Sequence, residues 1–285
     1  RLQPGKGKTI QFDGTIADDS FATNDGFQNA AGFGSDIRIG GTAGGGGGLV
    51  VFNGENTYSG NTILEGATLS AAVGTGVNDM SVIRFNGSGS FGIDSAANKV
   101  TSSLSLDSVG TFLLGEDYSR RSEADPGGTV WTGSGGFASG IKGLVTVNLG
   151  AIDENGKGQN LVWGSGGFFE PPSDGNGSGN NGVLTFGSDY SEGWVQFTNN
   201  VNVNNQTARV AVYKNNTYST SNATLSGKWV TGGSNSTLMV GDSSGSNYNG
   251  TLFMTGQNSL DNLVVAGGTL STFNGADPAG KLFKN

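Results

Sequence analysis

The chain has 285 residues, of which 53 are glycine, and it contains neither cysteine nor histidine. Glycine costs a helix interior about 1 kcal/mol per residue relative to alanine, which disfavours a mostly helical fold. The net charge of −8 disfavours binding to nucleic acid or to anionic membrane surfaces. Without cysteine or histidine there is no disulfide framework, no thiolate metal site and no Ser-His-Asp triad.

Hydrophobic residues make up 34% of the chain and charged residues 13%, which is typical of a folded protein rather than a disordered one. No apolar stretch approaches the ~20 residues of a membrane-spanning helix. The first residues, RLQPGKGKTI, are not typical of a signal peptide. We therefore expect that any export signal is removed or lies outside this sequence.

Short apolar segments separated by Gly, Asn, Asp and Ser follow one another along the chain, a pattern typical of strands joined by turns. Some alternate, as in Val201-Asn202-Val203, so we expect one packed face and one more exposed face. In chain order, the predicted strands are Thr9 to Phe12, Ile37 to Ile39, Leu49 to Phe52, Ser81 to Phe85, Leu104 to Leu106, Thr111 to Leu114, Leu144 to Asn148, Val183 to Phe186, Trp194 to Phe197, Ala208 to Tyr213, Lys228 to Val230, Leu238 to Val240, Leu252 to Met254 and Leu263 to Val265.

Three segments predict loops or corners. Residues 115–128 (GEDYSRRSEADPGG) are the most charged part of the chain, and residues 170–181 (EPPSDGNGSGNN) contain two adjacent prolines. The run Gly44 to Gly48 is either a flexible loop or a tight corner, since glycine suits both. We expect one domain over residues 1–285, with the two longer segments protruding from it.

Two pairs of similar segments recur. Residues 47–70 (GGLVVFNGENTYSGNTILEGATLS) have a weaker counterpart in residues 249–271 (NGTLFMTGQNSLDNLVVAGGTLS), where Gly54 aligns with Gly256 and Asn56 with Asn258. In the middle of the chain, VWTGSGGF (130–137) returns as VWGSGGF (162–168). One such unit cannot bury its own apolar face, so the repeats predict units that stack on one another.

We therefore expect an all-β fold, a parallel β-helix (β-solenoid) with irregular coils. Each coil contributes a few inward residues; in one coil these are Val50, Phe52, Tyr58, Leu64 and Leu69. About 22 residues per coil predict roughly 13 coils and a rod on the order of 60 Å long. The alternative is an antiparallel β-sandwich, whose strand spacing of about 8 to 12 residues also fits parts of the chain, notably Trp194 to Tyr213, but the solenoid is favoured.

The segment from Gly47 to Ser70 resembles the autotransporter-associated β-strand repeat. Its residues at matching places are Val50, Phe52, Gly54, Asn56, Thr57, Tyr58, Gly60, Thr62, Leu64, Thr68 and Leu69. The chain departs from the repeat at Asn61, where Gly is common, and at Gly66-Ala67, which usually stand in the opposite order. The resemblance is close over about one tenth of the chain and loose over most of the remainder.

This resemblance implies a right-handed parallel β-helix that a Gram-negative-type bacterium exports and that is displayed at, or released from, the cell surface. Members of the group serve as adhesins, toxins, matrix components or carriers of enzymatic insertions, so the resemblance predicts architecture and location better than activity. The last residues, ADPAGKLFKN, do not resemble the final strand of an autotransporter barrel. We expect a passenger-like piece or a stand-alone relative of one.

Carboxylates are the first candidates for chemistry, because several β-helix proteins cleave polysaccharides with them. The acidic pairs are Asp18-Asp19, Glu116-Asp117, Glu123 with Asp125, and Glu170 with Asp174. A glycosidase needs two facing carboxyls about 5 to 9.5 Å apart, but these pairs share no spacing, which favours solvated loop charges and no catalytic residue.

The nearest match to a calcium-binding nonapeptide is GSGSFGIDS (Gly87 to Ser95). Its acid, Asp94, is misplaced for that motif, and the segment does not recur. We therefore predict no metal site and no cofactor.

Two other groups of residues have alternative interpretations. Arg120-Arg121 could grip a carboxylate or sulfate of a partner, but salt bridges to Glu116, Asp117, Glu123 and Asp125 within the same segment are favoured. The tryptophans could stack on sugar rings or pack in the core. Core packing is favoured, because Trp131 and Trp163 hold equivalent repeat positions; the other two are Trp194 and Trp229.

The sequence thus predicts a non-enzymatic, extracellular structural or adhesive β-solenoid. Its open ends carry unpaired backbone edges that can template association into filaments or a surface layer, and the terminal segments show no strong cap. The expected partners are further copies of the chain and a surface glycan or host receptor, with no nucleic acid and no membrane span. The alternative is a polysaccharide-binding or polysaccharide-cleaving protein on the same scaffold, and a toxin fragment is a third option.

Overall fold

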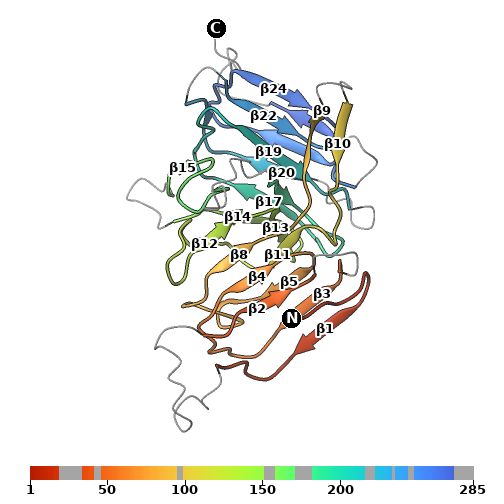
Figure 1. The fold of residues 1–285 in the computed structure, drawn as a ribbon, viewed down its shortest axis with the longest axis vertical. Helices are drawn as coiled ribbons and strands as arrows, with labels where there is room; N and C mark the ends of the chain where they lie inside the picture. Colours follow the sequence, from red (N-terminus) through yellow and green to blue (C-terminus); the bar gives the residue numbers. More distant parts are fainter. Residues whose placement is uncertain are drawn as a thin grey trace.

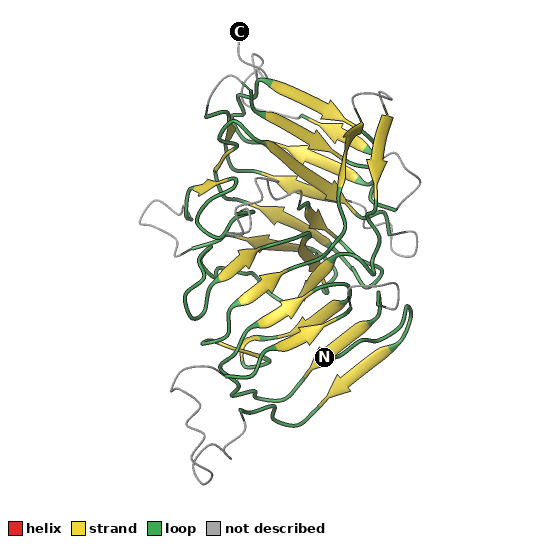
Figure 2. Ribbon diagram, in the orientation of Figure 1, coloured by secondary structure: helices red, strands yellow, loops and turns green. Residues whose placement is uncertain are grey.

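The computed structural model describes residues 1–18, 34–41, 46–94, 99–150, 158–170, 182–215, 222–232, 235–242 and 247–272. These residues form strands, turns and loops, and none of them lies in a helix that could cross a membrane. Figures 1 and 2 show an elongated molecule in which the strands lie one above another along the long axis. The fold is therefore all-β, as predicted.

One long sheet runs through the described part of the chain, and every pairing in it is parallel. Its nine strands, in spatial order, are β1 (Thr9–Phe12), β3 (Leu49–Phe52), β5 (Thr68–Ala71), β11 (Gly110–Leu114), β13 (Gly135–Ser139), β16 (Leu184–Phe186), β19 (Thr207–Val212), β22 (Thr237–Val240) and β24 (Asn262–Val265). Spatial order follows chain order. The chain therefore leaves this sheet after each strand and returns to add the next strand beside the last.

Between these visits the chain contributes to smaller parallel sheets. The N-terminal half has a four-stranded sheet of β2 (Ile37–Ile39), β4 (Thr62–Leu64), β8 (Ile83–Phe85) and β12 (Thr129–Trp131). The C-terminal half has a five-stranded sheet of β14 (Leu144–Val147), β17 (Trp194–Phe197), β20 (Asn222–Leu225), β23 (Thr251–Met254) and β25 (Thr269–Ser271). It also has a three-stranded sheet of β15 (Leu161–Val162), β18 (Val201–Asn202) and β21 (Trp229–Val230). The two halves therefore differ in how many sheets surround the core.

Two short strand pairs complete the described structure. The strands β6 (Val73–Gly74) and β7 (Val77–Asn78) pair in parallel, while β9 (Phe91–Asp94) and β10 (Lys99–Ser102) form an antiparallel hairpin. The hairpin lies beside β22 and β24 in Figure 1, far from its neighbours in sequence, and Ser102 Oγ donates a hydrogen bond of 2.6 Å to Asp242. After the hairpin in the sequence, Leu104 and Leu106 pack with Ala211 of β19 in a small second core, separate from the main one.

The main core consists of apolar side chains aligned from strand to strand. Across the long sheet Leu69, Phe112, Phe137 and Phe186 are register partners, and all four are buried. The predicted inward residues of one coil, Val50, Phe52, Tyr58, Leu64 and Leu69, are also all buried. Parallel, in-register pairing therefore converts a few apolar residues per layer into continuous rows.

Several predictions about the fold are wrong. Parallel pairing throughout the large sheets contradicts the antiparallel sandwich. The long sheet has nine strands, not roughly thirteen, because the connections vary in length: Thr68 stands 19 residues after its partner Leu49, but Leu184 stands 49 residues after Gly135. Leu104 to Leu106 is not a strand: it leads into a turn at residues 106–108, where Ser108 N donates to Ser105 O at 3.0 Å.

The expected loops have mixed outcomes. Residues 115–128 belong partly to the layers, because Tyr118 forms a parallel bridge with Val147 and Ser122 forms one with Thr129. Residues 171–181 lie outside the described residues. Of the glycine run, residues 46–48 form a tight corner: a Cβ at Gly46 would lie 2.0 Å from a backbone oxygen. The first two glycines of that run also lie outside the described residues.

Candidate functional site

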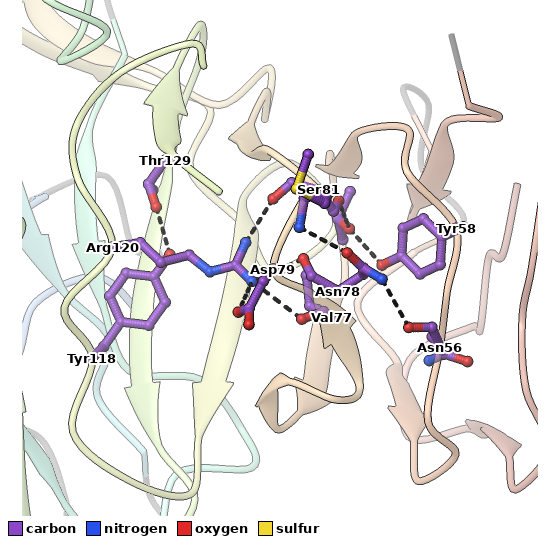
Figure 3. Close-up of polar contacts among 11 residues, drawn as sticks. Asn56, Tyr58, Val77, Asn78, Asp79, Ser81, Tyr118, Arg120 and Thr129 are labelled. Atoms are coloured by element: carbon purple, nitrogen blue, oxygen red, sulfur yellow. Dashed lines mark hydrogen bonds and ion pairs between the residues drawn. The ribbon is translucent and has the colours of Figure 1, made fainter. Parts of the chain in front are cut away.

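Arg120, predicted to lie on an exposed loop, is buried and binds the backbone of β7 and of the segment between β7 and β8 (Figure 3). Its guanidinium donates hydrogen bonds to the carbonyl oxygens of Ser81 at 2.6 Å, Asn78 at 2.9 Å and Val77 at 3.1 Å. Asp79 forms an ion pair with it at 3.6 Å, through a carboxylate that is 80% exposed. This arginine therefore connects two segments of the fold and does not face a partner.

Its neighbour Arg121 behaves as predicted, with an ion pair to Glu123 at 3.4 Å. The prediction is wrong for Arg120, because its ion-pair partner Asp79 lies outside residues 115–128. Burial therefore separates two adjacent arginines that look alike in the sequence.

Two tyrosines flank the arginine in Figure 3. The hydroxyl of Tyr58 shares a hydrogen bond of 2.6 Å with Thr62 Oγ1, and that of Tyr118 shares one with Thr129 Oγ1. Complete burial raises the pKa of Tyr118 to about 12, although the nearby Arg120 charge and Thr129 lower it in part. A phenol with that pKa stays protonated at neutral pH, so it is not poised as a general base.

Two of the predicted carboxylates, Asp18 and Asp117, are occupied by hydrogen bonds within the fold. Asp18 accepts from Ser59 N at 2.9 Å, Ser59 Oγ at 2.7 Å and Ser35 N at 3.1 Å. Partial burial raises the pKa of Asp18, but these hydrogen bonds outweigh it and lower the pKa below its usual value. Asp117 accepts from Thr146 N at 2.7 Å.

The remaining predicted acids give no site either. Glu170 accepts a hydrogen bond from Gly167 N at 3.2 Å, while Asp19 and Asp174 lie outside the described residues, as does the side chain of Asp94. Within the ranges that the structure describes, no three acidic side chains come together to hold a metal ion. The glycines that match the calcium-binding motif form backbone hydrogen bonds with other segments of the fold. Gly87 N, for example, donates to Ser134 O at 2.9 Å.

A buried acid that the sequence did not single out is Glu65, only 2% exposed. Arg38 donates to its Oε1 at 2.6 Å and Arg1 donates to its Oε2 at 2.8 Å, and Asn86 reaches it at 3.3 Å. Two guanidinium groups therefore compensate one buried charge on the outside of the four-stranded sheet. The residue follows β4 next to Gly66, where the sequence gives no sign of burial.

A pocket of about 390 Å³ lies where β3, β5 and β11 end. It is lined by Phe52, Asn53, Ser70, Ala71, Ala72, Val73, Thr75, Leu114, Gly115 and Glu116. Glu116 is its one acidic lining residue, whereas cleavage of a glycosidic bond requires two facing carboxyls. The pocket can accept a small polar molecule, but its described lining lacks the pair needed for hydrolysis.

The tryptophans divide into two groups. Trp131, Trp163 and Trp229 are fully buried, which confirms core packing for the repeat pair. The ring of Phe169 lies between the first two, with its centroid 5.7 Å from Trp131 and 4.1 Å from Trp163. Trp194 is 45% exposed on β17, so it alone among the four can meet a ligand from solvent.

Trp194 stands on the outer surface of the five-stranded sheet, which we call the neutral face. Inward residues such as Val195 and Phe197 alternate with outward ones and are buried. The outward residues, which define the neutral face, are Leu144 and Thr146 on β14, Trp194 and Gln196 on β17, Asn222 and Thr224 on β20, Thr251 and Phe253 on β23, and Thr269 and Ser271 on β25. None of the ten is charged.

Comparison with known protein families, curated proteins and solved structures finds no match to this chain. The arguments about function therefore rest on the geometry above and on the repeat in the sequence.

Proposed function

We propose that the chain is a right-handed β-solenoid of the autotransporter-passenger kind, with a structural or adhesive role outside the cell. The observation that carries this proposal is the in-register parallel stacking of strands from successive passes of the chain. About 98% of the crossover connections between parallel strands of one sheet are right-handed, which supports a right-handed winding of the chain.

The repeat that resembles the autotransporter family coincides with one such pass. In residues 47–70 the first strand, β3, pairs in register with the last, β5, and in residues 249–271 β23 pairs in the same way with β25. A Cβ at Gly54 would lie 2.2 Å from Gly14 O, so this place in the repeat requires close backbone approach. The buried Asn56 accepts from Ile16 N and donates to Gly76 O, both at 2.7 Å. The motif residues thus have physical roles in layer stacking.

Self-association follows from the edge strands of the stack. In the part of the chain that the structure describes, β1 and β24 each pair on one side only, and Val265 on β24 is 48% exposed although its register partner Val240 is buried. An open edge with unburied apolar residues can pair with another copy. The contact would be heterologous, because β24 of one copy would meet β1 of the next, and such contacts generate filaments when they do not close.

Light scattering and electron microscopy over a concentration series test this assembly. We expect filaments or concentration-dependent oligomers, and we expect Val265→Glu to abolish them because it places a charge at the edge. Met80→Glu is the matched control, since Met80 is 57% exposed but lies away from both edges. Monomers at every concentration, or an equal effect of both variants, would refute the assembly.

Location is tested by antibody labelling of intact source cells, with and without external protease. Protease-sensitive surface label or protein in the culture medium is expected, while label confined to lysed cells would contradict the extracellular role. Polysaccharide cleavage is not favoured, because no described pair of carboxylates converges on the pocket or on the neutral face.

A further inference from the structure

The neutral face is free of charged residues, and so are the strands of the three-stranded sheet. Its five strands carry no charged residue at all, in a chain with 38 Lys, Arg, Asp and Glu residues. The four-stranded sheet, by contrast, has Arg38 and Arg84 on outward positions. The nearest charges in sequence, Lys142 before β14 and Glu192 before β17, are of opposite sign. In space, the Asp117 carboxylate also borders the face, where it accepts from Thr146 N at 2.7 Å. An anionic ligand would therefore find no net electrostatic attraction here.

One end of the neutral face is apolar and open to solvent. Trp194 and Leu144 are register partners that are 45% and 43% exposed, and Ile141, which precedes β14, is 39% exposed. The segment that contains Ile141 runs beside Trp194, whose N donates to Gly143 O at 2.9 Å. Contiguous exposed apolar side chains of this kind mark interaction sites more often than isolated ones do.

Apart from Phe253 on β23, the remainder of the face offers neutral hydrogen-bonding groups in rows. Thr146, Gln196 and Thr224 are aligned by register next to the tryptophan row, and Asn222 and Thr251 continue across β20 and β23. Gln196 is oriented by a hydrogen bond of 2.9 Å from its Nε2 to Ser226 Oγ. An amide or hydroxyl can both donate and accept, so the rows suit a ligand with many hydroxyl groups.

The size of the face argues against a protein partner. Five strands spaced about 4.8 Å apart and four residues long at about 3.3 Å each cover about 19 by 13 Å, or roughly 250 Å². A stable protein interface buries about 800 Å² on each partner. The face is therefore too small to hold a second copy of the chain by itself, but it is long enough for a few linked sugar rings.

We propose that the neutral face binds an uncharged polysaccharide, with one pyranose ring stacked on Trp194 and its neighbours hydrogen-bonded to the threonine, asparagine and glutamine rows. A pyranose presents apolar C–H groups on its faces and hydroxyls around its rim, which matches an exposed aromatic ring beside neutral polar groups. This inference rests on the proposed adhesive function and names the ligand class for it. Self-association through β1 and β24 does not depend on it.

Tryptophan fluorescence and affinity electrophoresis test the proposal with defined probes. The probes are hexasaccharides of glucose in α-1,4 and β-1,4 linkage, of mannose, of galactose and of N-acetylglucosamine, with dextran as a polymer and polygalacturonate as the charged comparison. Because the other three tryptophans are buried, acrylamide quenching reports mainly on Trp194. At least one neutral probe is expected to bind, to shift the emission and to protect Trp194 from quenching.

Trp194→Ala is expected to weaken binding about tenfold or more and to leave the melting temperature nearly unchanged, since the side chain lies at the surface. Met80→Ala, which removes an exposed apolar side chain elsewhere, should bind as the unmodified protein does. Absence of binding to every neutral probe, stronger binding to polygalacturonate, or undiminished binding by Trp194→Ala would overturn the proposal. If Trp194→Ala loses self-association instead of polysaccharide binding, the neutral face is a contact between copies of the chain. If only Val265→Glu loses self-association, the result concerns the ends of the solenoid and not the neutral face.

Discussion

Replacing Arg120 should destabilise the protein far more than replacing its ion-pair partner Asp79. The arginine side chain is 7% exposed and donates to three backbone carbonyls at 2.6 to 3.1 Å. Hydrogen bonds to a charged group contribute about 1.5–3 kcal/mol each. Because desolvation of the guanidinium offsets part of their sum, we expect Arg120→Ala to lower the free energy of unfolding by about 3–5 kcal/mol.

The matched variants separate the carbonyl contacts from the ion pair. Asp79 is 80% exposed, so Asp79→Ala should change stability by no more than about 1 kcal/mol. Arg120→Lys keeps the charge, but the three donors of an ammonium share one nitrogen, whereas Arg120 uses Nη1 for Ser81 and Nη2 for Val77 and Asn78. One nitrogen cannot stand at both positions, so some of these hydrogen bonds are lost. The decrease in the free energy of unfolding for Arg120→Lys should lie between the decreases for Arg120→Ala and Asp79→Ala.

Urea unfolding followed by far-ultraviolet circular dichroism gives these free energies from the midpoint and slope. Hydrogen exchange then locates the loss, which should centre on the turn between β7 and β8 and on β8 itself. A loss below about 1 kcal/mol for Arg120→Ala, or equal losses for Arg120→Ala and Asp79→Ala, would refute the reasoning that buried carbonyls, not the ion pair, hold this side chain.

Three further predictions concern stacking between layers. Asn56→Ala should cost about 2–4 kcal/mol in urea unfolding, because it leaves Gly76 O buried and Ile16 N partly buried without their partner. A loss below about 1 kcal/mol would contradict the bridging role. Gly136→Ala should lower the melting temperature strongly, because the added Cβ would lie 1.9 Å from Thr185 O. Gly115→Ala should leave the melting temperature nearly unchanged, because a Cβ there has nothing within 4 Å. Equal changes in melting temperature for the two variants would be inconsistent with the packing. The pKa of Asp18 is lowered in the folded state, so its carboxylate contributes stability that is present above the unfolded pKa of about 3.9 and is lost as the pH falls through the lower folded pKa. Asp18→Asn should therefore flatten the acid limb of a plot of melting temperature against pH. An unchanged limb would show that the hydrogen bonds of Asp18 are not stabilising.

Local patterns in the sequence predict much of this fold. Alternation in segments such as Leu49–Phe52 and Trp194–Phe197 gives both the strand and its inward residues, because the side-chain period of a strand is two. The strand Gly135–Ser139 could not be predicted in this way, because Gly135 and Gly136 have no side chains and so show no alternation of apolar and polar residues. Glycine is needed there because neighbouring backbone passes too close for a Cβ, and that constraint is visible only in three dimensions.

Layer number and the buried charges could not be predicted for a related reason. The number of layers depends on how many residues separate register partners on neighbouring strands. Insertions such as the β9–β10 hairpin change that number and have no periodic pattern in the sequence. The repeat VWTGSGGF and its copy differ in structure, because Gly135–Ser139 forms a strand while Gly164, Gly166 and Gly167 adopt positive φ in a turn. The partners of buried Arg120 lie 39 or more residues away in the sequence, and those of buried Glu65 lie 21 or more residues away, so no local window contains them.

The five-stranded sheet offers the most direct test of parallel, in-register stacking, through engineered cysteine pairs in a chain that has no cysteine of its own. Gln196 and Thr224 are register partners on neighbouring parallel strands, whose separation of about 4.8 Å suits a disulfide. We expect Gln196→Cys with Thr224→Cys to oxidise to an intramolecular disulfide, read by mass spectrometry, and Gln196→Cys with Asn222→Cys to remain reduced. Antiparallel strands centred on Val195 and Ala223 would instead bring the second pair together. Preferential oxidation of that pair would therefore contradict parallel, in-register stacking.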